Sequence, residues 1–285
     1  MKLLQHLLWL LLVCGNVHAD PSIWKVEGRH NAVYLLGTIH LLHADQVLPD
    51  NVQRIYRAST ALWLEVDMAA VDPLATQVSL MQRGLLPEGK TLDALLDAPT
   101  RKQLAEAATH LGMSTETLAP MRPWLAALTL EMGQYLQQGF SPASGVEMQL
   151  IQQAERDGKT VHGLETMDQQ LELFASLSSK AEIGFLQQTL QELDQSADEA
   201  ATLEAAWLAG DDAAMAGYLA TAMQQDAPLY HQLTTARNRR WVTELQSVLD
   251  NGDETTLVAV GALHLVGNQG LVALLRQAGY RVSRL

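Results

Sequence analysis

One pattern occurs twice in the chain, as Val33-Tyr34-Leu35-Leu36-Gly37-Thr38-Ile39-His40-Leu41 and again as Leu257-Val258-Ala259-Val260-Gly261-Ala262-Leu263-His264-Leu265. Each stretch consists of four apolar residues, a glycine, two further residues, a histidine and a leucine. A short apolar run that ends at a glycine is typical of a buried strand. We therefore expect two buried strands, each followed closely by a histidine at its carboxyl end.

A third apolar run, Ala61-Leu62-Trp63-Leu64, ends in a similar way at Glu65. In open α/β sheets, ligand sites gather outside the carboxyl ends of the strands. A glycine near such an end lets another part of the backbone or a ligand approach closely. The three runs predict that His40, Glu65 and His264 meet at one edge of a sheet.

Two imidazoles and one carboxylate suit more than one kind of chemistry. They are suitable ligands for zinc, manganese, iron or cobalt, and an ion with an open position acidifies bound water for hydrolysis. They could also act without a metal, with Glu65 orienting a histidine that serves as general base. Both histidines could equally satisfy hydrogen bonds at strand ends and nothing more, so the pattern alone leaves these alternatives open.

The rest of the chain predicts an α/β fold. Apolar and polar residues alternate over residues 22–27, a turn pattern follows, and residues 32–36 form a short apolar run, which together indicate a hairpin. Residues 71–158 and 167–250 are almost entirely helical in pattern. Short buried strands separated by helices favour a central mixed sheet flanked by helices. We expect the long helical part to be an insertion or cap, within one domain that covers residues 20–285.

Composition excludes several classes of function. The 285 residues carry a formal net charge of −13, which repels polyanions, so we expect no nucleic-acid partner. Cys14 is the only cysteine, and it lies in the first nineteen residues, which we expect to be removed as a signal peptide. The mature chain would then have no thiolate nucleophile and no cysteine-bound zinc. Neither H-E-x-x-H nor G-x-S-x-G occurs, which disfavours the ordinary zincin and serine-hydrolase mechanisms.

The first nineteen residues have the pattern of a secretory signal peptide. Lys2 supplies a positive charge, an apolar stretch runs from Leu7 to Cys14, and Val17-His18-Ala19 provides small residues for cleavage after Ala19. No later segment approaches the ~20 apolar residues that a membrane span needs. We expect a periplasmic or secreted protein without an integral membrane span once the signal is removed.

Several motifs occur in an order that resembles a known family. They are Leu36-Gly37-Thr38-Ile39-His40, Leu64-Glu65-Val66-Asp67, Arg122-Pro123-Trp124, Ser144-Gly145-Val146-Glu147, Gly163-Leu164-Glu165-Thr166 with Gln169, Arg237-Asn238 and Val260-Gly261-Ala262-Leu263-His264. In this order and spacing the chain resembles the TraB/GumN proteins, whose animal relatives are the Tiki proteases that inactivate Wnt. The resemblance implies a fold akin to the erythromycin-esterase and haem-binding ChaN-like proteins, in which two related halves share a mixed sheet.

The resemblance also implies roles for particular residues. His40, Glu65 and His264 are similar to the metal ligands of the Tiki relatives, which implies a divalent ion such as manganese, cobalt or zinc. The esterase-like relatives use a similar set with no established need for a metal. Arg237 is implied to point inward and hold a carboxylate or the substrate, although a charged run on a helix usually forms a solvated face.

Two further carboxylates are candidates. Glu165 follows the brief strand pattern at residues 160–163, so it could face the same sheet edge, or it could be an ordinary first-turn acid on the next helix. The same two alternatives apply to Glu147, which follows Gly145 at a helix start. We take Glu65, Glu165, Glu147 and Arg237 as candidate catalytic residues.

The sequence thus predicts an exported, metal-dependent hydrolase of the Tiki-like kind that acts on a peptide. Two alternatives remain: a metal-independent esterase-type hydrolase that acts on a small molecule, and a periplasmic protein that binds a peptide or haem without catalysis. Activity that survives a strong chelator would distinguish the first alternative, and binding without turnover would distinguish the second.

Overall fold

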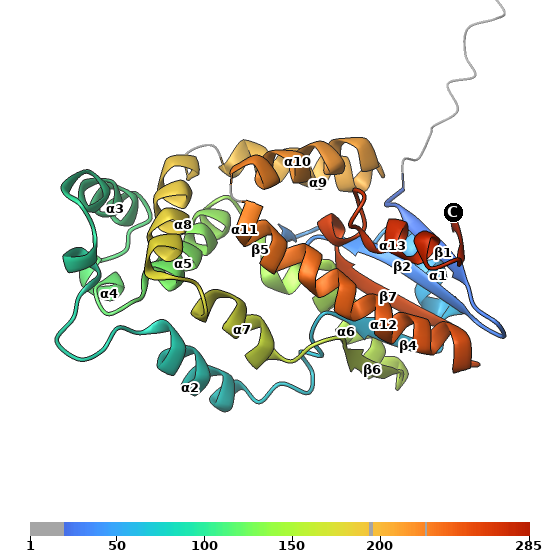
Figure 1. The fold of residues 1–285 in the computed structure, drawn as a ribbon. Coiled ribbons are helices and arrows are strands. Elements are labelled where there is room, and N and C mark those ends of the chain that lie inside the picture. Colours follow the sequence, from blue (N-terminus) through green and yellow to red (C-terminus); the bar gives the residue numbers. More distant parts are fainter. Residues whose placement is uncertain (1–19, 194–195, 226) are drawn as a thin grey trace, which may run out of the picture.

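A six-stranded sheet forms the centre of the molecule in the computed structural model, which describes residues 20–193, 196–225 and 227–285 (Figure 1). The predicted signal peptide, including Cys14 and the cleavage point after Ala19, lies outside the described residues. The strand order is β6-β4-β7-β2-β1-β8. The strands are β1 (Ile23–Glu27), β2 (Ala32–Thr38), β4 (Ala61–Leu64), β6 (Thr160–Gly163), β7 (Thr256–Gly261) and β8 (Arg281–Arg284).

The sheet is mixed, as predicted. Strands β6, β4, β7 and β2 run parallel to one another, whereas β1 pairs antiparallel with both β2 and β8. The two repeated stretches lie side by side, with Thr38 of β2 opposite Gly261 of β7. Because parallel strands end at the same edge of a sheet, the segments that come after these four strands meet there.

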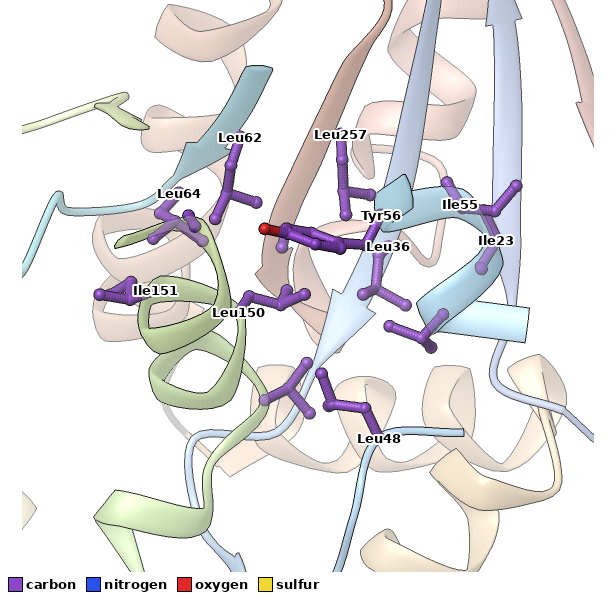
Figure 2. Close-up of a cluster of buried hydrophobic side chains, with 14 of the residues drawn as sticks. Ile23, Leu36, Leu48, Ile55, Tyr56, Leu62, Leu64, Leu150, Ile151 and Leu257 are labelled. Atoms are coloured by element: carbon purple, nitrogen blue, oxygen red, sulfur yellow. The ribbon is translucent and has the colours of Figure 1, made fainter. Parts of the chain in front are cut away.

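One face of the sheet is covered by α1 (Asp50–Ala58) and α6 (Val146–Asp157). Figure 2 shows Leu36, Leu62 and Leu257 of the strands pointing toward these two helices. Each of these three side chains is at most 1% exposed. Successive residues of a strand point to opposite faces, so the neighbours of these leucines are available to the other face.

The opposite face is covered by α12 (Ala236–Asn251) and α13 (Leu271–Gln277). Leu35 and Val258, the strand neighbours of Leu36 and Leu257, pack in a second cluster of buried side chains that includes Trp241 of α12. With apolar side chains buried on both faces, β2 and β7 form a three-layer core with these helices. The core therefore holds the carboxyl ends of β2 and β7 in fixed positions.

Four of the remaining helices, α3 (Ala98–His110), α4 (Thr115–Leu118), α5 (Pro123–Gln137) and α8 (Ser179–Glu192), share a buried cluster of their own and form a lobe to the left of the sheet in Figure 1. By contrast, α9 (Ser196–Leu208) and α10 (Asp212–Gln225) contribute Trp207 and Met215 to the cluster that α1 and α6 form on the sheet. The other helices are α2 (Pro73–Gly84), α7 (Met167–Ala175) and α11 (Ala227–Tyr230). The prediction of an α/β fold with a large helical insertion is confirmed.

A small second sheet pairs β3 (Leu42–His43) with β5 (Phe140–Ser141). No helix among the described residues has the length and apolar character that crossing a membrane requires. The relationship to the erythromycin-esterase and ChaN-like fold stays a prediction.

Candidate active site

The candidate residues come after the carboxyl ends of the four parallel strands. His40 lies two residues beyond β2, and His264 ends a single 3₁₀ turn, Ala262–His264, directly after β7. Glu65 follows β4, and Glu165 follows β6, where its backbone N–H donates to the Glu65 carbonyl oxygen at 2.9 Å. The structure brings these four side chains to one edge of the sheet.

The two glycines of the repeated pattern permit the close approach. A methyl group on Gly37 would lie 2.9 Å from the Ala262 Cα atom, so only glycine lets the turn that carries His264 pack against β2. A methyl group on Gly261 would lie 3.2 Å from Glu65 Oε1 and 3.6 Å from His40 Nε2. The Gly261 position is therefore a cradle around which the imidazole and carboxylate groups gather.

His264 is buried and held as a neutral imidazole. Its Nδ1 lies 2.6 Å from Asn238 Oδ1, while the Asn238 amide nitrogen donates to the carbonyl oxygens of His264 and Gln269 at 3.2 and 2.8 Å. Since the Asn238 oxygen faces the ring, Nδ1 carries the proton and Nε2 keeps a lone pair. Burial lowers the pKa of His264 to about 4, which keeps the ring neutral at pH 7.

His40 is oriented in a similar way but has the opposite charge preference. Its Nδ1 lies 2.8 Å from Glu147 Oε1, and the hydroxyl of Thr38 donates to the same oxygen. The negative charge of Glu147 raises the pKa of His40 to about 9. With Nδ1 engaged by Glu147, the Nε2 atom of His40 is the one that faces the cradle at Gly261.

Glu65 is a buried carboxylate with several partners. Its Oε1 accepts from the Gly261 N–H at 2.8 Å, and its Oε2 accepts from Gln170 at 3.2 Å and from the Arg237 guanidinium. Burial raises the pKa of Glu65, but His264, Arg237 and His40 together lower it more, to about 2. Glu65 is therefore ionised throughout the ordinary pH range.

Arg237 links the two buried carboxylates. It is the second residue of α12, which continues the π-helical segment His231–Thr235 without a break. Its Nε donates to both oxygens of Glu165 at 3.0 and 3.2 Å, its Nη2 donates to Glu65, and its Nη1 lies 3.1 Å from His264 Nε2. The buried guanidinium thus supplies one positive charge between Glu65 and Glu165.

Neither Glu165 nor Glu147 lines the cavity at this edge. Glu165 lies behind Arg237 and also receives Arg240 at 3.4 Å, and Glu147 lies behind His40. The cavity has a volume of about 520 Å³. Its walls are mainly apolar, and His40, Glu65, Arg237 and His264 are the ionisable side chains that line it. The remaining lining residues are Thr38, Ile39, Gln170, Leu173, Phe174, Leu203, Met215, Leu233, Thr234, Gly261, Ala262 and Leu263.

Sequence reasoning did not assign three of the residues that hold this site. Asn238 was recognised only as part of a motif, and its contact with His264 gives that motif a physical role. Gln170 contacts Glu65 from helix α7, and Thr38 contacts Glu147. Thr38, like Asn238, belongs to one of the motifs quoted above, whereas for Gln170 the sequence carries no distinguishing signal, because a single polar residue in a helix is ordinary.

Comparison with known proteins places the chain in a family. The sequence profile described as the TraB/PrgY/gumN family matches residues 22–284. The chain belongs to this family. Within the TraB/PrgY/gumN family, it is 26% identical to the uncharacterized protein YbaP of Escherichia coli (strain K12), over 94% of this chain and 97% of that protein. No solved structure matches the chain.

Tiki proteins are more distant relatives. The chain is 25% identical to the metalloprotease TIKI2 of Danio rerio over 88% of its own length and 58% of that protein. It is 23% identical to the metalloprotease TIKI1 of Homo sapiens, over 93% of its own length and 62% of that protein. The chain thus spans about three fifths of the length of these two metalloproteases.

A divalent ion, which the names of the Tiki relatives suggest, needs donor atoms that converge on one point. Both histidines have a hydrogen-bond partner at Nδ1 and are left with Nε2, which is how proteins usually orient imidazole ligands. His264 Nε2 lies 3.7 Å from Glu65 Oε1. Across the described residues, however, no three histidine, cysteine or acidic side chains are grouped to hold an ion. The donors fit in kind and orientation, while the Arg237 guanidinium contacts two of them.

Proposed function

We propose that this chain is a hydrolase that cleaves peptide bonds with the help of a divalent metal ion. One observation carries the proposal: His40, Glu65 and His264 converge on the Gly261 cradle at the end of a largely apolar cavity. A cavity of this composition, with few converging polar groups, is the usual form of a small ligand or substrate site. The Tiki relatives, which are named metalloproteases, support the same class of activity.

In this proposal, His40, Glu65 and His264 hold manganese, cobalt or zinc. Held there, a divalent ion would supply Lewis-acid polarisation of a substrate carbonyl and would lower the pKa of bound water. Asn238 fixes the tautomer of His264, and Glu147 orients the His40 ring so that its Nε2 faces the cradle. Because Glu147 raises the pKa of His40 to about 9, His40 would release its Nε2 proton on binding an ion. Glu65 and His264 are buried, whereas the His40 side chain is 65% exposed, so solvent reaches the cavity on the His40 side.

Glu165 and Glu147, which do not line the cavity, act through neighbouring side chains rather than on the substrate itself. Glu165 accepts from Arg237 and Arg240, and we assign it the positioning of Arg237 rather than proton transfer. Glu147 contacts the ring of His40 and can hold or release a proton at His40 Nδ1. Arg237 lines the cavity, and its N–H groups are already taken by Glu165, Glu65, His264 and the Leu233 carbonyl oxygen, so we assign it a positive charge beside the substrate rather than a direct hydrogen bond to it.

Export to the periplasm, or secretion, belongs to the proposal and rests on the sequence of residues 1–19. The substrate is proposed to be a peptide rather than a nucleic acid, because the net charge of −13 repels polyanions. The decisive experiment for the metal is elemental analysis of the purified protein, paired with cleavage of a peptide library with and without Mn²⁺, Co²⁺ or Zn²⁺.

The variants His40→Ala and His264→Ala should lose both the bound ion and the metal-stimulated cleavage. His110→Ala is the matched control, because His110 is exposed at the end of α3. If both site variants keep their metal content and their activity, the assignment of these ligands is wrong.

A second candidate is favoured by Arg237. Its guanidinium already donates to Glu65 and lies 3.1 Å from His264 Nε2, so a positive charge is available between these groups without an ion. A metal-independent, esterase-type hydrolase that uses this charge predicts full activity in the presence of a strong chelator. The metal-assisted mechanism predicts loss of activity under the same conditions.

A further inference from the structure

A second apolar cavity lies next to the candidate active site, between helices α2, α5 and α7. Its volume is about 550 Å³, which falls in the range of ~300–1,000 Å³ that is usual for ligand pockets. The residues that line it are Leu80, Met113, Trp124, Leu125, Leu128, Thr129, Met132, Gly133, Leu136, Met167, Gln170, Leu171 and Phe174, and we call this cavity the α5–α7 groove. Among the described residues that line the groove, none carries a charge.

The α5–α7 groove leaves apolar side chains in contact with solvent. Met132 is 38% exposed and Leu136 is 53% exposed, and both lie on the outer part of α5. Contiguous apolar surface on a folded protein commonly marks a binding site. Met113, Met132 and Met167 contribute flexible thioether side chains, which adapt to ligands of different shape.

The α5–α7 groove shares a wall with the candidate active-site cavity. Gln170 and Phe174 line both cavities, and since they are four residues apart on α7 they lie on one face of that helix. Gln170 donates to Glu65 Oε2 at 3.2 Å, and Phe174 stacks on Trp124 with ring centroids 5.7 Å apart. A single residue therefore separates the reacting carboxylate from the floor of the groove.

We propose that the α5–α7 groove binds an uncharged, apolar segment of the substrate, on one side of the bond that is cleaved. This inference rests on the proposed hydrolase function and names the class of peptide that the site prefers. Aliphatic and aromatic side chains such as Leu, Met and Phe gain free energy by leaving water for these walls. A charged side chain would lose its hydration there and meet no opposite charge.

The wall that the groove shares with the cavity, next to Glu65, is the reason to assign the groove to substrate rather than to another occupant. A substrate that reaches His40 and Glu65 has Gln170 and Phe174 as its wall, and the groove is the next apolar space along α7. Two other occupants are outcomes of the test. They are the apolar segment Leu7–Cys14 of this chain and the same groove on a second copy.

The test measures binding separately from cleavage. Two hexapeptides with blocked ends, Gly-Leu-Met-Phe-Leu-Gly and Gly-Ser-Ser-Ser-Ser-Gly, are titrated calorimetrically into the His264→Ala variant, so that cleavage does not consume them. We expect the apolar peptide to bind at least tenfold more tightly. Because this variant lacks a proposed ligand, the binding result stands even if the wild-type chain shows no hydrolysis.

Groove variants locate the binding. Met132→Lys and Leu136→Lys, each made in the His264→Ala background, should weaken binding of the apolar peptide at least tenfold. Leu74→Lys is the matched control, because Leu74 is 69% exposed on α2 but does not line the groove, and its affinity should be unchanged. Circular dichroism checks that each variant is folded.

The proposal is overturned if the two peptides bind equally, or if both groove variants bind the apolar peptide as tightly as the control does. It is also overturned if the apolar peptide binds only after residues 1–19 are removed, which would assign the groove to the chain's own segment. The groove would be assigned to a second copy of the chain if two results occurred together. Sedimentation would show a dimer that Met132→Lys converts to a monomer, and the protein would not distinguish between the two peptides.

Discussion

Replacing Arg237 with Gln removes the only guanidinium that contacts both Glu65 and Glu165 among the described residues. The side chains of Arg237 and Glu65 are 7% and 8% exposed, so water cannot take the place of the lost guanidinium beside the Glu65 carboxylate. Breaking a buried ion pair by removing one partner costs about 3–5 kcal/mol. We therefore expect Arg237→Gln to lower the free energy of unfolding at pH 7 by about that amount.

The pKa of Glu65, which Arg237 helps to lower together with His264 and His40, gives the sign of the pH dependence. Its pKa falls from 4.5 to about 2 in the folded protein. At about 1.4 kcal/mol per unit, this shift contributes about 3 kcal/mol of stability. Because the folded pKa is lowered, the contribution is complete above pH 4.5 and is lost as the pH falls toward 2. The loss in free energy of unfolding caused by Arg237→Gln should accordingly be largest at neutral pH and become smaller as the pH is lowered.

Urea unfolding followed by far-ultraviolet circular dichroism, at pH 7 and at pH 3, measures both expectations. Arg240→Gln is the matched control, because the Arg240 side chain is 51% exposed and lies 3.4 Å from Glu165. A half-exposed ion pair contributes at most about 1 kcal/mol. A deficit for Arg237→Gln no larger than that of the control, or one that stays constant from pH 7 to pH 3, would refute the reasoning.

Three further predictions concern the groups around the cradle. Gly261→Ala places a methyl group 3.2 Å from Glu65 Oε1 and should lower the cleavage rate at least tenfold, whereas Gly184→Ala, where nothing lies within 4 Å, should leave the rate unchanged and raise the urea midpoint. Asn238→Leu removes the acceptor for His264 Nδ1 and should lower metal affinity or activity about 10–100-fold, as calorimetry and cleavage assays would show. The pKa of His264 falls from 6.5 to about 4, so its stabilising contribution is complete above pH 6.5 and is lost as the pH falls toward 4. Urea midpoints measured between pH 7 and pH 4 should therefore fall less steeply for His264→Asn than for the wild-type chain, and equal slopes would contradict this assignment.

The sequence predicted the frame of the molecule because that frame depends on local patterns. Four apolar residues, a glycine and a histidine indicate a buried strand with an imidazole just beyond its carboxyl end, and the same pattern at Val33 and Leu257 indicated two equivalent strands. Since parallel strands deliver their carboxyl ends to one edge, the shared location of His40, Glu65 and His264 could be inferred from three short stretches. The family resemblance pointed Arg237 inward.

Only the tertiary structure decided how those groups contact one another. Arg237 meets Glu65 across 172 positions and Glu165 across 72, through the docking of α12 on the sheet. That contact places a guanidinium beside two of the predicted metal ligands, Glu65 and His264. Gln170 reaches Glu65, and the α5–α7 groove opens beside it, because separate helices pack together there. A periodic pattern shows which face of an element is apolar, but the partner of that face is chosen by packing over long sequence separations.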